Sequence, residues 1–379
     1  MGTGRPAGLV PQRTMTRAVC FLLVLGTCPL FAEGSHLLRL EPPGMDVSAV
    51  LKTIADEKLP VGGIIIDVAR SGQTLFPVPD SPYATRAGFE DGTQLTRWID
   101  EIHAQGLKAY AGVDAVRWWT AAYADPDPFA DRPDLVELDS DLGCNPANDA
   151  KYASPWHPAV RSGLISLARA LGSSYQALDG LVICLRLSPS AYTGFSDAAR
   201  RACIDALRID PLDLAVFGVS EDWDPHLKAW MEWRPRALTE LMRELTSAYR
   251  EADRTGQDRV IAIGSGAYPA YSLRLQACCA DDWLTWALDG LIDGVALDTV
   301  PGRARWHEEL AVGLDVLERA RLGIAPYIAI RGESHGSVVP LADRYALVAG
   351  AGLEAHPLLL DPSVASELGS AMELLRSLR

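Results

Sequence analysis

Apolar runs of strand length alternate with amphipathic stretches from Leu37 to the end of the chain. The runs are nearly continuous rather than alternately apolar and polar, as is expected for parallel strands that are buried on both faces. Eight such strands are predicted: Leu37–Leu40, Gly62–Ala69, Leu107–Val113, Leu178–Leu187, Arg259–Gly264, Leu291–Leu297, Ile324–Ile330 and Leu353–Leu360.

The stretches between these runs have the spacing and the terminal residues of helices. Asp46 is a suitable N-cap for the first helix, and Gly106 is a natural glycine at the end of the second. Helices are predicted over 46–58, 93–105, 157–175, 230–253, 283–287, 304–321, 340–349 and 364–378. Each strand is therefore followed by a helix, which is the order of parallel βαβ units.

Eight strand–helix units predict a single (β/α)8 barrel, or TIM barrel, over residues 33–379. A doubly wound sheet more often carries a glycine-rich phosphate loop, and neither GxGxxG nor GxxxxGK[ST] occurs in the sequence. Residues 114–155 and 188–229 follow the third and fourth strands. They are expected to be long loops that build a lid or a cleft wall.

The N-terminus has the features of a secretory signal in residues 1–32. Arg13 and Arg17 precede a short apolar run, Ala18–Ala32, which is too short to span a membrane comfortably. The alternative is a buried core helix, but the run has no polar face. We expect a secreted or periplasmic protein, with a lipid anchor at Cys28 as an alternative. Membrane contact is expected only through this segment or that anchor.

The composition is that of a folded globular chain, and the charge is acidic. The 379 residues are 48% hydrophobic and 22% charged, with a formal net charge of −14. This charge disfavours a nucleic-acid partner, because phosphate binding needs a basic face. Five cysteines follow residue 32, an odd number, and they are expected to be mostly small buried residues.

Several chemistries lack their sequence motifs. The chain has no GxSxG elbow, no HExxH and no CxxC pair, and its seven histidines are scattered. We therefore expect neither a metal nor a cofactor.

In a (β/α)8 barrel, functional residues gather at the carboxyl ends of the strands. These positions combine carboxylates, arginines and tryptophans, which are the groups that bind and cleave sugars. Asp298 is predicted as nucleophile or base and Glu333 as general acid. The predicted substrate-binding residues are Asp67, Arg70, Asp114, Arg117, Trp118, Arg186, Arg331 and His335.

Each of these residues also has a purely structural interpretation. The acids can form ion pairs with neighbouring arginines that tie the strand ends together. Of Trp118 and Trp119, at least one is expected to pack in the core, because consecutive residues cannot share a face. His335 could be a base, but a lone histidine in a polar loop is more often exposed to solvent.

Several segments resemble the bacterial glycosyl hydrolase-like 10 barrels, a divergent member of which this chain would be. The likeness runs through Gly63–Val68, Ser71–Pro77, Trp98–Val113 and Ser154–Arg161, although Gln73 replaces an acid of the family pattern. The resemblance implies a TIM barrel that acts on a carbohydrate, either a polysaccharide or an oligosaccharide, with a cell-envelope glycan among the candidates.

The fourth strand departs from the family pattern, DGIHFDDY. Here the segment Asp179–Arg186 reads DGLVICLR, so Cys184 and Leu185 replace two acids. Neither residue transfers protons as a carboxylate does. Either the catalytic pair has moved to Asp298 and Glu333, or the barrel binds a glycan without cleaving it. Arg186 indicates an anionic ligand, such as a uronic acid or a sulfated sugar, because guanidinium groups pair with planar oxyanions.

Overall fold

The computed structural model describes sixteen ranges of the chain, all within one compact unit that spans Glu33–Arg379. The predicted signal segment, with Cys28, lies outside the described residues. The described ranges are 36–42, 44–120, 127–144, 150–188, 192–214, 224–256, 259–265, 278–298, 306–320, 323–331, 333–334, 337–338, 341–351, 353, 356–362 and 367–379.

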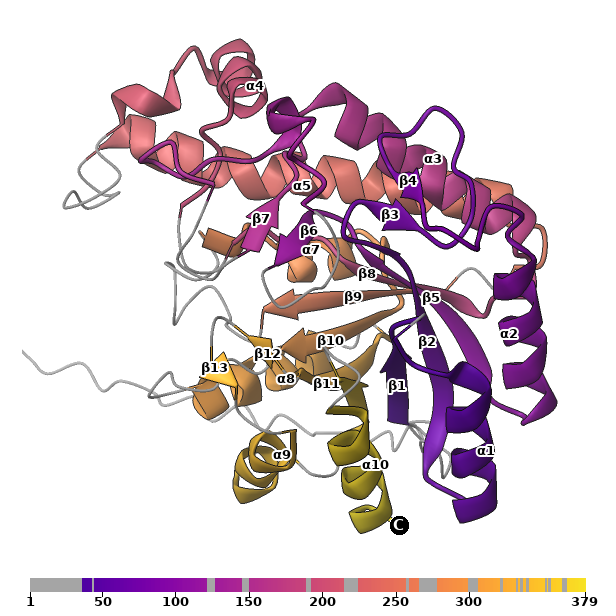
Figure 1. Cartoon of the computed structure of the whole chain (residues 1–379). Helices are drawn as coiled ribbons and strands as arrows, with labels where there is room; N and C mark the ends of the chain where they lie inside the picture. The colour runs from indigo at the N-terminus through magenta and orange to yellow at the C-terminus, as the bar shows by residue number, and fades with distance from the viewer. Residues whose placement is uncertain are drawn as a thin grey trace, which may run out of the picture. The chain divides into compact units, whose positions relative to one another are not determined.

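Eight parallel strands form a closed barrel (Figure 1). The order is β1-β14-β11-β10-β9-β8-β5-β2, and β1 also pairs with β2, which closes the sheet. The predicted (β/α)8 barrel is therefore confirmed, with every expected strand near its expected place. The strands are β1 (His36–Leu40), β2 (Val61–Arg70), β5 (Lys108–Asp114), β8 (Gly180–Cys184), β9 (Arg259–Ser265), β10 (Gly294–Asp298), β11 (Ala325–Arg331) and β14 (Leu358–Asp361).

A helix follows each barrel strand, as predicted. The Asp46 side chain caps the first helix by accepting the Ala49 N–H at 3.1 Å. Figure 1 shows α3 and α5 side by side on one flank, and these two helices are in extensive contact. The helices are α1 (Val47–Glu57), α2 (Thr93–Ala104), α3 (Pro158–Ser174), α5 (Pro225–Ala252), α7 (Trp283–Leu288), α8 (Trp306–Ala320), α9 (Leu341–Gly350) and α10 (Leu368–Ser377). None of the described helices is long and apolar enough to cross a membrane.

The two long loops contain secondary structure that the sequence pattern did not predict. The loop after β5 contains an antiparallel pair, β6 (Arg117–Thr120) and β7 (Ala150–Tyr152), with a 3₁₀ turn between them, η1 (Pro133–Leu135). The loop after β8 contains α4 (Asp197–Leu207) and a second 3₁₀ turn, η3 (Pro211–Asp213).

Glu137 joins these two loops. Its buried carboxylate accepts the N–H groups of Gly194, Phe195 and Ser196 at 3.0–3.1 Å and the Ser196 hydroxyl at 3.0 Å. The Ser196 hydroxyl also caps α4 by accepting the Ala199 N–H at 3.3 Å. One carboxylate therefore fixes the start of α4 against the loop that follows β5.

Short strands extend the barrel at its carboxyl end. β3 (Gln73–Thr74) folds back on β2, and β4 (Ala84–Thr85) pairs with β3. After β11, β12 (Glu333–Ser334) and β13 (Ser337–Val338) form a second small hairpin. These additions lie on the side of the barrel where the strand ends meet.

Candidate active site

The inward side chains of the barrel change from apolar to polar toward the carboxyl ends of the strands. An apolar layer that includes Leu37, Ile65, Ile263, Ala296 and Leu359 fills the interior. Since side chains two positions apart on a strand point to the same face, the next inward layer is set by the residues two places further on. Those residues are Arg39, Asp67, Ser265, Asp298 and Asp361.

All residues of this polar layer are at most 5% exposed. Buried charges are tolerated only when they are paired and hydrogen-bonded. The layer accordingly takes part in two clusters of polar and charged side chains. One joins β1, β2 and β14, and the other joins β9 and β10 to Arg186, just after β8. β1 and β9 are opposite each other in the strand order, so the two clusters lie on opposite walls of the barrel.

Arg39 is the centre of the first cluster. Its Nε donates to Asp67 Oδ1 at 3.1 Å, a second guanidinium nitrogen also bonds that oxygen, and Nη1 lies 3.5 Å from Asp361 Oδ2. Burial disfavours the guanidinium charge, but Asp67 and Asp361 outweigh it and raise the pKa of Arg39 above its usual range. A Cβ at Gly112 would lie 2.9 Å from Asp67 Oδ1, so glycine there leaves room for this carboxylate.

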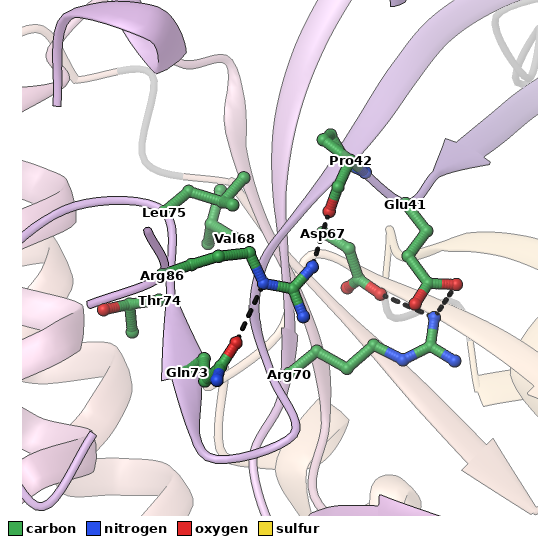
Figure 2. A pocket seen from close by; sticks show the side chains of 9 residues that line it. All are labelled: Glu41, Pro42, Asp67, Val68, Arg70, Gln73, Thr74, Leu75 and Arg86. Carbon is green, nitrogen blue, oxygen red and sulfur yellow. Dashed lines mark hydrogen bonds and ion pairs between the residues drawn. The ribbon is translucent and has the colours of Figure 1, made fainter. Parts of the chain in front are cut away.

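A narrow cleft opens beside this cluster, between the end of β1 and the β2–β3 hairpin (Figure 2). Glu41 and Asp67 both line it, and the Arg70 guanidinium bonds Glu41 and lies 3.6 Å from Asp67 Oδ2. On the other side, Arg86 donates to Gln73 Oε1 at 2.9 Å and to the Pro42 carbonyl at 3.1 Å. The enclosed space is small, enough for about one water molecule.

Glu41 has an unusual acidity. Burial raises its pKa to about 7, Arg70 opposes the rise, and the carboxylates of Asp67 and Asp361 add to it. The Asp67 pKa is also raised by burial, against the opposing effect of Arg39 and Arg70. The Glu41 side chain remains 20% exposed, against 3% for Asp67, so of these two carboxyls Glu41 is the more accessible to solvent.

Arg186 is the centre of the second cluster. It bonds Asp298 Oδ2 at 2.5 Å, and this attraction raises the Arg186 pKa well above its usual range although burial opposes it. Asp281 lies nearby and accepts the Ser265 N–H and hydroxyl at 2.5 and 2.9 Å. Burial raises the Asp281 pKa to about 6. The described contacts of Arg186 are therefore those of an ion pair with Asp298.

Asp114 and Arg117 form a third ion pair at the end of β5. The Arg117 Nε and Nη2 atoms lie 3.0 and 2.9 Å from Asp114 Oδ2. Tyr152 of β7 is buried beside them. Burial raises its pKa to about 12, and the nearby guanidiniums of Arg117 and Arg186 oppose that rise.

Trp118 lies in the core rather than at a sugar-binding surface. It is 1% exposed, its ring packs between Tyr83 and Phe129 with centroids 4.7 and 5.9 Å away, and its Nε1 donates to the Ala115 carbonyl at 3.0 Å. Trp119 is partly exposed, with Lys151 Nζ 5.3 Å from its ring centroid. The indole that remains accessible is therefore that of Trp119, so the predicted binding role of Trp118 does not fit its position.

The structure places the backbone, but not the side chains, of two other predicted residues. Arg331 ends β11 opposite Asp361, and Glu333 begins the β12–β13 hairpin. Their side chains and the whole of His335 lie outside the described part of the structure.

The described residues include no group of three or more histidine, cysteine or acidic side chains arranged to hold a metal ion. The five cysteines from Cys144 onward are free thiols, and all but Cys144 are buried.

Arg39, Glu41 and Asp281 are not among the predicted site residues. Arg39 carries a signal that would have identified it, because it is the one charged residue within the apolar run Leu37–Leu40. Glu41 follows that run directly. Asp281 has no such signal, because it lies in the chain after β9 and reaches the cluster only through the fold.

Comparison with solved structures gives the same architecture. The glycoside hydrolase domain of PgaB (BpsB) from Bordetella bronchiseptica is similar with a TM-score of 0.63 and 15% identity, over 91% of this chain and 98% of that one. The catalytic domain of β-amylase from Paenibacillus polymyxa is similar with a TM-score of 0.59 and 14% identity, over 91% and 99%. No family model and no curated protein matches the sequence. At these identities the likeness establishes the TIM-barrel fold.

Proposed function

We propose that this protein is a carbohydrate-active barrel of glycoside hydrolase type, a divergent relative of the glycosyl hydrolase-like 10 proteins. The observation that carries the proposal is the layer of carboxylates and arginines at the carboxyl end of the barrel. Active sites of TIM-barrel enzymes lie at this end, and glycosidases need two carboxyl groups there. The similar solved structures are glycoside hydrolases, which supports the same class of ligand.

Asp298 is the proposed nucleophile or base. It ends β10, faces the barrel interior and is oriented by its ion pair with Arg186 at 2.5 Å. An anionic, oriented carboxylate is what attack on an anomeric carbon, or activation of a water, requires. The sequence assigns the acid role to Glu333, in the hairpin after the neighbouring strand β11.

A neutral glycan suits this site better than an acidic one. Arg39, Arg70, Arg117 and Arg186 each form an ion pair with a carboxylate. An anionic sugar would have to displace Asp298 from Arg186, at the cost of leaving a buried carboxylate without its counterion. The suggestion of a uronic acid or sulfated sugar, which rested on Arg186, is therefore weakened.

The second candidate function is glycan binding without cleavage. It is favoured by Cys184 and Leu185, which stand where the resembled family has two acids. Their side chains are 3% and 0% exposed, and both pack in apolar clusters. No carboxyl group therefore takes their place on β8. In this case Asp298 and Arg186 would serve only to orient the glycan.

We also propose that residues 1–32 direct export, giving a secreted or periplasmic protein. Expression of the full chain in a bacterial host, followed by N-terminal sequencing of the periplasmic or secreted product, tests this. A start at Glu33 supports signal cleavage after Ala32, and a lipid-modified Cys28 supports the anchor instead. A full-length product in the cytoplasm contradicts export.

The function itself is tested with a panel of neutral and acidic polysaccharides. Reducing-end release and thermal shift are scored in the same wells for the wild type and for Asp298→Asn. Release that disappears in the variant supports the hydrolase. A thermal shift without release supports the binding barrel, and neither signal on any polysaccharide contradicts both.

A further inference from the structure

We propose that Glu41, rather than Glu333, is the proton donor of this barrel, acting from the cleft that it shares with Asp67. This inference rests on the proposed hydrolase function and assigns one role within it. It starts from the position of Glu41, the first residue after β1, at the carboxyl end where the strand ends converge (Figure 2).

The geometry of the cleft meets two requirements of a general acid. The carboxyl group must reach the substrate, and the Glu41 side chain is 20% exposed on a cleft that is open to solvent. The carboxyl group must also be held in place. The Arg70 guanidinium bonds it, and Arg70 is itself fixed between Glu41 and Asp67.

The charges around Glu41 support the assignment. Arg39 and Arg70 face it from β1 and β2, and the carboxylates of Asp67 and Asp361 face it from β2 and β14. Burial, as the largest effect, raises the pKa of Glu41 to about 7. A general acid is most effective when its pKa lies near the working pH, so that it is protonated before the reaction and able to release the proton during it.

The reaction needs only Glu41, Arg70, Asp298 and a water molecule. The Glu41 proton passes to the glycosidic oxygen as the bond from that oxygen to the anomeric carbon breaks, and the bonding electron pair stays with the oxygen. Arg70 then neutralises the Glu41 carboxylate. In the retaining route the Asp298 carboxylate forms the new bond to the anomeric carbon. A water that Glu41 deprotonates then attacks that carbon, which breaks the bond to Asp298 and restores both side chains. In the inverting route a water attacks the anomeric carbon as Asp298 takes its proton, and exchange with solvent returns a proton from Asp298 to Glu41.

The test compares two leaving groups in the full-chain protein. An alkoxide leaving group needs a proton, whereas dinitrophenolate leaves without one. The substrates are the polysaccharide that the wild type cleaves and the 2,4-dinitrophenyl glycoside of the same sugar. Glu41→Gln is expected to lower kcat on the polysaccharide by about 100-fold or more, and to lower it on the dinitrophenyl glycoside by much less. The alkaline limb of the wild-type kcat/KM profile near pH 7 should also disappear.

Glu57→Gln is the matched control. Glu57 also pairs with an arginine, Arg376, at 2.6 Å, but it lies at the end of α1, away from the strand ends. Its substitution should leave both rates unchanged. Retained cleavage of the dinitrophenyl glycoside by Glu41→Gln shows at the same time that this variant is folded.

Three results would overturn the assignment. An equal loss on both substrates would make Glu41 a structural residue, and unchanged rates would remove it from the reaction. Leaving-group dependence in Glu333→Gln instead would return the role to Glu333. In each case the hydrolase itself stands, because the wild type is active. A wild type that cleaves no substrate overturns both the hydrolase and the donor.

Discussion

Arg186 and Asp298 form a buried ion pair of 2.5 Å that bridges the ends of β8 and β10, with β9 between them. Their side chains are 8% and 0% exposed. Arg186 follows directly after Cys184 and Leu185, and Asp298 is the proposed nucleophile or base. The pair therefore connects the end of the fourth barrel strand to the proposed active site.

Removal of one partner of this pair should destabilise the barrel strongly. Arg186→Met leaves the Asp298 carboxylate buried without a counterion, and we expect a loss of about 3–5 kcal/mol in the free energy of unfolding. Urea unfolding measures it. The double variant Arg186→Met/Asp298→Leu should recover much of the loss, because the unpaired charge is gone. A loss below about 1 kcal/mol in the single variant would show that the pair is not buried as described.

Trp118 and Trp119 should separate stability from binding. Trp118→Ala removes a fully buried ring and should cost about 3–5 kcal/mol of stability, with little change in glycan affinity for the protein that remains folded. Trp119→Ala should cost less stability, because its ring is partly exposed. Thermal unfolding measures the stability, and titration with the polysaccharide that the wild type cleaves measures the affinity. A larger stability loss in Trp119→Ala would contradict the placement of the two rings.

The ionisation of Glu41 should appear in the pH dependence of stability. A carboxyl group whose pKa is raised from 4.5 to about 7 on folding favours the folded state only while it is protonated. Its contribution is therefore fully present below about pH 4.5 and is lost as the pH rises through 7, with a total on the order of 3 kcal/mol. Glu41→Gln should lack this component.

The difference in unfolding free energy between the wild type and Glu41→Gln separates the contribution of Glu41 from that of other groups such as Asp281, whose pKa is also raised. Unfolding free energies of wild type and Glu41→Gln are compared between pH 4 and pH 8. Parallel curves over this range would mean that Glu41 titrates near its ordinary value.

Glu137 should control the order of the chain that enters α4. Glu137→Ala removes an acceptor from three buried N–H groups. Those of Gly194 and Phe195 keep a bond to the Leu138 carbonyl at 3.3 Å, whereas the Ser196 N–H loses its Glu137 acceptor, which costs about 1–3 kcal/mol. Hydrogen exchange at Gly194, Phe195 and Ser196 should accelerate well before the barrel unfolds. Glu137→Gln keeps one carbonyl acceptor and should show a smaller effect. Unchanged exchange in Glu137→Ala would place the stability of this segment elsewhere.

The barrel was predictable because its signals are local. Buried parallel strands are apolar runs in the sequence, and residues such as Asp46 and Gly106 indicate where helices begin and end. α4 was missed because it lies in a long polar segment, where its anchor is Ser196 bonded to the distant Glu137. No local pattern reports a contact between two loops.

The site was predictable only in part. Strand ends identify Asp67, Asp114 and Asp298 as members of the carboxyl-end layer, because the fold brings all strand ends together. Which arginine pairs with which acid depends on the registers of neighbouring strands. The sequence left the arginine partner of Asp67 open, and in the structure Arg39, on the neighbouring strand β1, forms a closer contact with Asp67 than Arg70 does. The raised pKa of Glu41 depends on its burial and on charged side chains from β1, β2 and β14. These surroundings cannot be read from the sequence.

The proposed hydrolase function requires that the Asp298 carboxylate, at the end of β10, takes part in cleaving a glycan. The most direct test is reducing-end release from the polysaccharide panel by the wild-type protein and by Asp298→Asn, measured at matched concentration and with both proteins shown to be folded by thermal unfolding. We expect release by the wild type from at least one neutral polysaccharide and a loss of about 1,000-fold or more in the variant. Equal release by a folded Asp298→Asn would contradict it.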